Sequence, residues 1–188
     1  MARTMLLNWI VTLTLLYTTL THEQDIHVNN GGIWGYQGQM DMCPPGTKAT
    51  GFDLLVEPPQ GDGDDTALNA IKLLCTKPGD RTIRAEITSK TGAWGIWTGV
   101  KWCSYGALFR FSLQVEASIG SDDDTAANNI KFECPYPKIL EGNGGRWGTY
   151  GGWSDMCQKG ICGIQTRVED SQGSGDDTAL NDVIFRCC

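Results

Sequence analysis

Three short acidic segments contain the residues of this chain that are best suited to chemistry. Each is an Asp-Asp pair followed by Thr-Ala: Asp64-Asp65, Asp123-Asp124 and Asp176-Asp177. Two carboxylates can carry out glycosyl transfer without histidine when they lie roughly 5–5.5 Å apart for a retaining reaction, or about 6.5–9.5 Å apart for an inverting one. Asp and Thr side chains also fix turns by bonding to nearby backbone N–H groups. Because active sites are rarely triplicated, we interpret the pairs as structural turns and keep catalysis as the alternative.

Few other groups are available for catalysis. The only histidines, His22 and His27, lie near the start of the chain. Ser-His-Asp and Cys-His catalysis need a positioned imidazole, and catalytic zinc sites usually need several. We therefore expect no such site in the body of the protein. The segment Asp62-Gly63-Asp64-Asp65 lacks the spacing and distal Glu of a helix-loop-helix calcium site, so we expect neither a metal nor a cofactor.

The tryptophans form two groups. Trp34, Trp94 and Trp147 each precede a glycine and recur at equivalent places, which favours packing in the core or on an axis. A second group, Trp97, Trp102 and Trp153, does not recur as a set of three. These are the better candidates for stacking on sugar rings, because the apolar face of a sugar matches an indole. Half-buried structural tryptophan is the alternative for this second group.

The acidic turns belong to a unit that occurs three times. Each copy has Trp-Gly, then a cysteine, then a Val-Glu pair ten residues before the turn threonine. An asparagine follows that threonine by three residues and a second cysteine follows it by nine. Features at such regular offsets define an internal repeat. The copies span about residues 31–75, 91–134 and 144–187.

The repeat has the pattern of β-strands. Apolar residues alternate before the second cysteine of each copy, at Ile71-Leu73-Cys75, Ile130-Phe132-Cys134 and Val183-Phe185-Cys187. A period of two is typical of a half-buried strand. One small sheet cannot bury its apolar face alone, but three can if they face a common axis. The sequence therefore predicts an all-β prism of three antiparallel sheets with internal pseudo-threefold symmetry, folding as a single domain over residues 22–188.

The start of the chain predicts secretion. A signal peptide is indicated over residues 1–21. It begins with the positive charge of Arg3, continues as an apolar stretch from Met5 to about Leu20 and ends at a cleavage site of small residues. No later segment is a candidate membrane span. The net charge of −7 argues against nucleic acid and against anionic membrane surfaces as partners. It favours attraction to basic proteins of the same secretion.

Eight cysteines behind a signal peptide predict a disulfide framework. The repeat gives the symmetric pairs Cys43–Cys75, Cys103–Cys134 and Cys157–Cys187. Cys162 and Cys188 have no counterpart in the other copies, so we expect them to pair with each other. Because Cys187 and Cys188 are adjacent, a swapped arrangement of Cys157–Cys188 with Cys162–Cys187 stays open.

The chain resembles the vitelline membrane outer layer protein family in features that occur in all three copies. These are Trp-Gly, an acidic Asp-Asp-Thr-Ala turn with its asparagine, and a cysteine in the last strand. The resemblance implies a disulfide-stapled β-prism of Greek-key sheets and secretion into the outer coat of eggs or into other fluids. It also links members to carbohydrate, including transfer of N-acetylglucosamine units between chito-oligosaccharides. We therefore expect a secreted structural or interaction protein of an extracellular coat, associated with oligosaccharides. The alternatives are a carboxylate-based transferase and a non-catalytic lectin.

Overall fold

The computed structural model describes residues 24–58, 68–116, 127–170 and 180–188. In these ranges every regular element is a strand, as the alternating pattern predicts. The strands are β1 (Asp25–Ile26), β2 (Tyr36–Gln37), β3 (Asp41–Met42), β4 (Lys48–Val56), β5 (Leu68–Thr76), β6 (Ala85–Ile87), β7 (Ile96–Trp97), β8 (Lys101–Trp102), β9 (Arg110–Val115), β10 (Ala127–Glu133), β11 (Ile139–Glu141), β12 (Thr149–Tyr150), β13 (Ile161–Val168) and β14 (Leu180–Cys187). The described part of the chain contains no helix that could cross a membrane.

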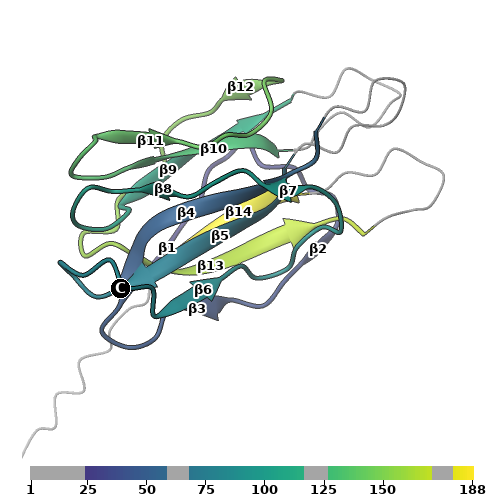
Figure 1. The fold of residues 1–188 in the computed structure, drawn as a ribbon. Helices are drawn as coiled ribbons and strands as arrows, with labels where there is room; N and C mark the ends of the chain where they lie inside the picture. The colour runs from purple at the N-terminus through teal and green to yellow at the C-terminus, as the bar shows by residue number, and fades with distance from the viewer. Residues whose placement is uncertain (1–23, 59–67, 117–126, 171–179) are drawn as a thin grey trace, which may run out of the picture.

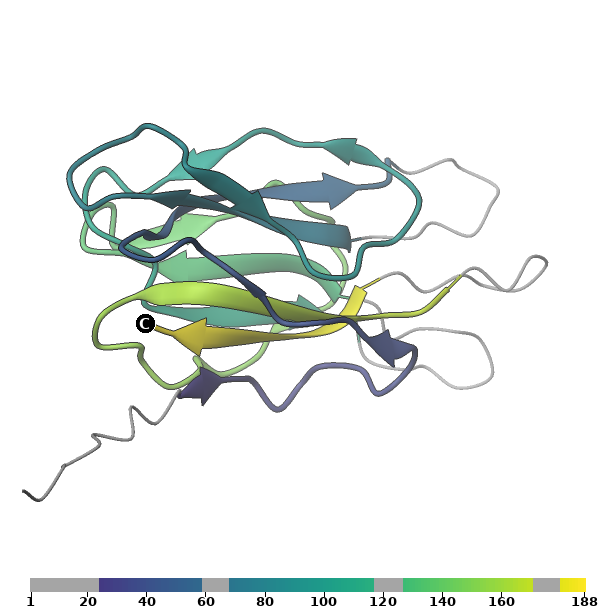
Figure 2. The same cartoon turned by 90° about the horizontal axis from the view of Figure 1, so that it is seen from below.

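Three antiparallel sheets form the walls of a prism (Figures 1 and 2). Each sheet is centred on one long hairpin, β4–β5, β9–β10 or β13–β14. Short strands extend it on both sides, in the orders β6-β5-β4-β7, β11-β10-β9-β12 and β1-β14-β13-β2. β8 adds to β4, and β3 adds to β13. The predicted β-prism of three antiparallel sheets is therefore confirmed.

Each sheet combines the hairpin of one repeat with the Trp-Gly segment of another. Strands β7 and β8 of the second repeat pair with β4 of the first, and β12 of the third pairs with β9 of the second. Strands β2 and β3 of the first repeat pair with β13 of the third, which closes the ring. The repeat pattern did not predict this exchange, because an alternating pattern identifies a strand but not its partner.

The core lies on the prism axis, where each hairpin contributes one equivalent cross-strand pair. These pairs are Phe52–Leu73, Phe111–Phe132 and Ile164–Phe185, and all six side chains are fully buried. The aromatic rings pack directly on one another, with centroids 4.8 Å apart for Phe52–Phe132 and for Phe111–Phe185. Tilted and edge-on ring contacts of this kind add to the stabilisation from apolar burial.

Three disulfides lie at the end of the prism where β4, β9 and β13 begin. Cys43–Cys75, Cys103–Cys134 and Cys157–Cys187 join the early cysteine of each repeat to the end of its hairpin. The swapped arrangement considered above is wrong, because Cys157 bonds Cys187. The expected bond between Cys162 and Cys188 is not formed in the structure, where both are free thiols. The two side chains lie in hydrogen-bonding contact.

Candidate functional site

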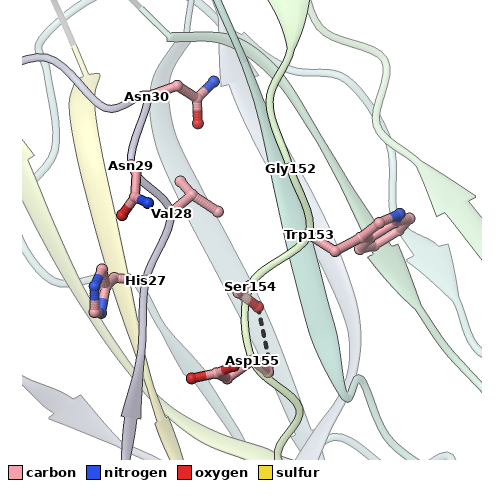
Figure 3. A pocket seen from close by; sticks show the side chains of 8 residues that line it. All are labelled: His27, Val28, Asn29, Asn30, Gly152, Trp153, Ser154 and Asp155. Atoms are coloured by element: carbon pink, nitrogen blue, oxygen red, sulfur yellow. Dashed lines mark hydrogen bonds between the residues drawn. The ribbon is translucent and has the colours of Figure 1, made fainter.

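A groove of about 350 Å³ separates two extended segments of the chain, residues 27–30 and residues 152–155 (Figure 3). The first segment continues from β1 on the β13–β14 sheet. The second continues from β12 beside the β9–β10 sheet. The groove therefore lies at a seam between two walls of the prism. Its lining residues are His27, Val28, Asn29, Asn30, Gly152, Trp153, Ser154 and Asp155.

The N-terminal wall of the groove is anchored on both sides. Strand β1 pairs with β14, and Asp25 accepts two hydrogen bonds from Arg186, at 2.8 and 3.0 Å. Val28 is buried and turns toward the core. Further along, the Asn30 amide donates to the Leu113 carbonyl at 2.9 Å. These contacts hold the segment in one place although it belongs to the start of the chain.

The opposite wall is fixed along β9. Gly151 N–H donates to the Leu113 carbonyl at 3.0 Å, and Ser154 N–H donates to the Phe111 carbonyl at 2.9 Å. The Ser112 hydroxyl adds a bond to the Gly151 carbonyl at 2.8 Å. Five hydrogen bonds thus attach the two walls to the same strand, counting the one from Asn30 and the one that Phe111 N–H donates to the Ser154 hydroxyl. The groove is therefore preformed by hydrogen bonds to β9.

The groove is lined by His27, Ser154 and Asp155. The position of His27 near the start of the chain did not predict this, because β1 pairs with β14 and carries the histidine onto the body of the fold. The set does not form a nucleophile. The buried Ser154 hydroxyl accepts from Phe111 N–H at 3.2 Å and donates to the Asp155 carbonyl at 2.8 Å. With its hydrogen bonds directed at backbone, the hydroxyl is not activated by an imidazole.

The groove instead offers exposed hydrogen-bonding groups. His27, Asn29 and Asp155 are exposed, and Figure 3 shows Asp155 directed toward the His27 side of the groove. A carboxylate accepts hydrogen bonds, amides both donate and accept, and an imidazole can do either. The side-chain oxygen of Asn30 is buried and has no hydrogen-bond donor in the described parts of the chain. A hydroxyl from a bound molecule or a water would satisfy it.

The Asp-Asp pairs predicted as turns or as catalytic carboxylates lie outside the described residues. These six are Asp64, Asp65, Asp123, Asp124, Asp176 and Asp177. The asparagine that follows each pair is described and buried, at Asn69, Asn128 and Asn181. Its backbone carbonyl accepts a hydrogen bond at 2.7 Å from a glycine N–H near the next Trp-Gly, from Gly92, Gly145 and Gly32 respectively. The asparagines therefore lie where neighbouring repeats join.

The three tryptophans predicted to stack on sugars are not brought together. Trp97 and Trp102 lie on the β4–β5 sheet, while Trp153 lies beside the β9–β10 sheet and points away from the groove (Figure 3). Cations already lie over two of the rings. The ring centre of Trp97 is 4.2 Å from Lys72 Nζ, and that of Trp153 is 5.2 Å from the Arg110 guanidinium carbon. Half-buried Trp102 covers Gly51.

The recurring tryptophans are exposed, so their predicted place in the core or on the axis is wrong. Trp34 and Trp94 are each 55% exposed and Trp147 is 69% exposed. Each lies beyond the last paired residue of a central strand, at the end of the prism opposite the disulfides. We call this the tryptophan end. Recurrence alone could not reveal exposure, because a symmetric surface position repeats as faithfully as a core position.

Comparison with known proteins identifies the family to which this chain belongs. The fold is a β-prism, and a model of the vitelline membrane outer layer protein I (VOMI) family matches residues 24–188. The chain belongs to this family. Its relatives include the human and mouse proteins named vitelline membrane outer layer protein 1 homolog, which are 49% and 46% identical over 165 residues. Each alignment covers 87% of this chain and 82% of the relative.

Two solved lectin structures have a similar fold. Calsepa lectin, determined in complex with a bisected glycan, aligns with a TM-score of 0.55 at 19% identity. That alignment covers 87% of this chain and 96% of the lectin. A single-chain recombinant jacalin aligns with a TM-score of 0.53 at 10% identity, over 90% of this chain and 97% of jacalin. At these identities the likeness shows the fold alone.

Proposed function

We propose that this protein is a secreted carbohydrate-binding protein of an extracellular coat or secretion, and that the groove between residues 27–30 and 152–155 binds a saccharide. One observation carries the proposal: a preformed groove presents the carboxylate of Asp155 beside the amide and imidazole groups of Asn29, Asn30 and His27. Alternating donors and acceptors of this kind recognise the hydroxyl groups of a sugar.

The size of the groove favours a small ligand. Ligand sites typically have volumes of ~300–1,000 Å³, and a groove of about 350 Å³ is at the lower end of that range. A terminal sugar or a short oligosaccharide fits such a site better than a large apolar molecule. The lectin neighbours support the same ligand class, because Calsepa lectin was determined with a glycan bound.

The chain has the features of a secreted protein. Residues 1–21 read as a signal peptide, and three disulfides staple a domain of modest size. The family name refers to an egg coat layer, which supports a structural role in such a matrix. With a net charge of −7, the protein would attract basic proteins of the same secretion as further partners.

Binding without turnover is favoured over sugar transfer at this groove. Among the described residues that line it, only Asp155 carries a carboxylate, whereas glycosyl transfer through carboxylates requires two. We therefore expect an N-acetylglucosamine hexamer to stay intact during incubation with the disulfide-bonded protein. Mass spectrometry would detect longer and shorter oligomers. Their appearance would instead establish a transferase and direct the search to the Asp-Asp pairs.

The direct test is titration of the protein with short oligosaccharides, followed by calorimetry or ligand-observed NMR. Asp155→Ala should lower the affinity at least tenfold, because it removes the only carboxylate acceptor on the described lining. Asp41→Ala is the matched control, since Asp41 is an exposed acid on β3 outside the groove. Equal affinities of the wild type and Asp155→Ala for every sugar bound would refute the assignment of the groove.

A further inference from the structure

The tryptophan end contains a feature that the groove does not explain. Its three indoles occupy equivalent positions, because the residue two places after each tryptophan pairs with the last residue of a central strand. These pairs are Ile96–Val56, Thr149–Val115 and Tyr36–Val168. Trp94, Trp147 and Trp34 therefore lie on the three corners of one end of the prism, and none of them lines the groove.

The glycine of each Trp-Gly has a structural explanation. Gly35, Gly95 and Gly148 all have positive φ angles, of 79°, 111° and 80°. A Cβ at any of the three would come within 2.6 Å of the backbone of the neighbouring valine or glutamate. The glycine therefore lets the Trp-Gly segment approach the next hairpin closely.

The tryptophan has no comparable structural explanation. The residues around the Trp-Gly pair differ among the three copies: Ile33, Ala93 and Arg146 precede it, and Tyr36, Ile96 and Thr149 follow it. The indole is kept at all three positions although more than half of its surface is exposed. Large exposed aromatics that recur on one face of a soluble protein mark an interaction surface.

A second cavity lies near two of the tryptophans in the chain. A cavity of about 260 Å³ opens between the segments that carry Trp34 and Trp147. It is lined by Asn30, Gly31, Gly32, Val115, Glu116, Thr149 and Gly151. The cavity offers backbone groups, an amide and a carboxylate, and its lining residues Gly32 and Thr149 are each two residues from a recurring tryptophan. This combination suits a ligand with both an apolar face and a ring of hydroxyl groups, as a pyranose has.

We propose that the tryptophan end binds chains of uncharged pyranose sugars by stacking them on Trp34, Trp94 and Trp147. Charge selects this ligand class. A half-exposed glutamate follows each valine, at Glu57, Glu116 and Glu169, and the whole chain has a net charge of −7. The net charge of −7 disfavours anionic polysaccharides, nucleic acids and acidic membranes as ligands, although exposed Arg146 beside Trp147 and Arg167, which donates to the Gly35 carbonyl, also lie at this end.

This surface goes beyond the proposed function, from which it takes only the ligand class. The groove fits a short saccharide, whereas three separate stacking positions can be occupied together only by a long chain or by several neighbouring chains. Simultaneous contacts raise the apparent affinity far above that of one contact. We expect each single indole to contribute modestly to retention on a polymer, and the three together to determine it.

The test compares retention on insoluble cellulose and chitin for the wild type and for Trp34→Ala, Trp94→Ala and Trp147→Ala, made singly and together. Each single variant should lose roughly three- to tenfold in affinity, and the triple variant at least about a hundredfold. Trp97→Ala is the matched control, since it removes an exposed indole that is already covered by Lys72. Trp→Tyr at the same three positions should restore much of the retention. Heparin beads serve as the anionic control.

Thermal melting confirms that each variant is folded, and titration with a soluble N-acetylglucosamine trimer reports on the groove. Both proposals are supported if polymer retention falls with each indole removed while trimer binding persists and depends on Asp155. Retention that depends on the indoles without any trimer binding supports this surface and shows that the groove does not bind this trimer. Three outcomes would each overturn the proposal for the tryptophan end. The triple variant could keep its retention, the wild type could show none, or retention could be stronger on heparin.

Discussion

The prism axis and the tryptophan end obey the same threefold symmetry but have opposite environments. On the axis, Phe52 and Phe111 have Ile164 as their counterpart in the third hairpin, and all three are fully buried. At the tryptophan end the three counterparts are identical and mostly exposed. The buried position accepts a different apolar residue, whereas the exposed position keeps its indole. Recurrence within a chain therefore reports symmetry, and burial must be established separately.

The largest expected effect tests this contrast through stability. Phe132→Ala should lower the free energy of unfolding by about 3–5 kcal/mol, because it opens a cavity where Phe132 meets Phe52 and Phe185. Trp94→Ala should change it by less than about 0.5 kcal/mol, as is usual for exposed side chains. Urea denaturation of both variants measures the difference. A similar cost for the two would contradict the surface role of the indole.

A pair of glycine variants separates backbone strain from steric exclusion at the tryptophan end. Gly95 and Gly99 have similar φ angles, of 111° and 105°, but only Gly95 has backbone atoms where a Cβ would be placed. Gly99→Ala should cost about 1 kcal/mol from its conformation alone, and Gly95→Ala at least about 2 kcal/mol. Thermal melts of the two variants provide the comparison. Equal losses would mean that β7 can move away from β4 at little cost.

The second and third hairpins offer a comparison of charge. Asn129 Oδ1 accepts from Ile130 N–H at 2.9 Å, and Asp182 Oδ1 accepts from Val183 N–H at 2.8 Å at the equivalent place. Burial raises the pKa of the Asp182 carboxyl, although its bond from Val183 N–H and nearby Arg167 oppose the shift.

Because this pKa is raised on folding, the ionised carboxylate destabilises the folded protein at neutral pH. This destabilisation disappears in acid, below the ordinary pKa of Asp. Asp182→Asn keeps an acceptor and removes the charge, so it should raise Tm by a few degrees at pH 7. The gain should shrink as the pH falls and the wild-type carboxyl is protonated. Melting curves at several pH values check this, and a gain that grew toward acid would have the wrong sign.

The smallest expected effect concerns the thiols of Cys162 and Cys188. Their mutual hydrogen bond lowers the pKa of Cys188, whereas it raises that of Cys162, together with burial. We expect iodoacetamide to label exposed Cys188 first, and mild oxidation to join the two sulfurs. The joined form should gain little stability, under about 1 kcal/mol, because Cys157–Cys187 already closes nearly the same loop. Mass spectrometry counts the labelled thiols, and a large gain in Tm would contradict the loop argument.

Much of the architecture was predictable from the sequence because alternation and fixed offsets are direct signals. The alternation at Ile71-Leu73-Cys75 placed a strand where β5 lies, and its counterparts placed β10 and β14. The exchange of strands between repeats was not predictable, since β2, β7 and β12 contain two residues each and show no periodicity. His27 was missed for the same reason, because it follows a two-residue strand whose partner is 161 residues away.

Strands β1, β2 and β3 close the ring by pairing with the last hairpin, so the ring can close only after that hairpin has been synthesised. Each disulfide joins cysteines only 30 to 32 residues apart, so each can form as soon as its own hairpin has been made. The Asp25–Arg186 contact spans 161 residues and must wait for nearly the whole chain. The first described residues to be translated are thus the last to reach their partners, and contacts of such high sequence separation are slow to form. Until then, the edge of β13 stays open to strands of other molecules, which exposes the nascent chain to aggregation.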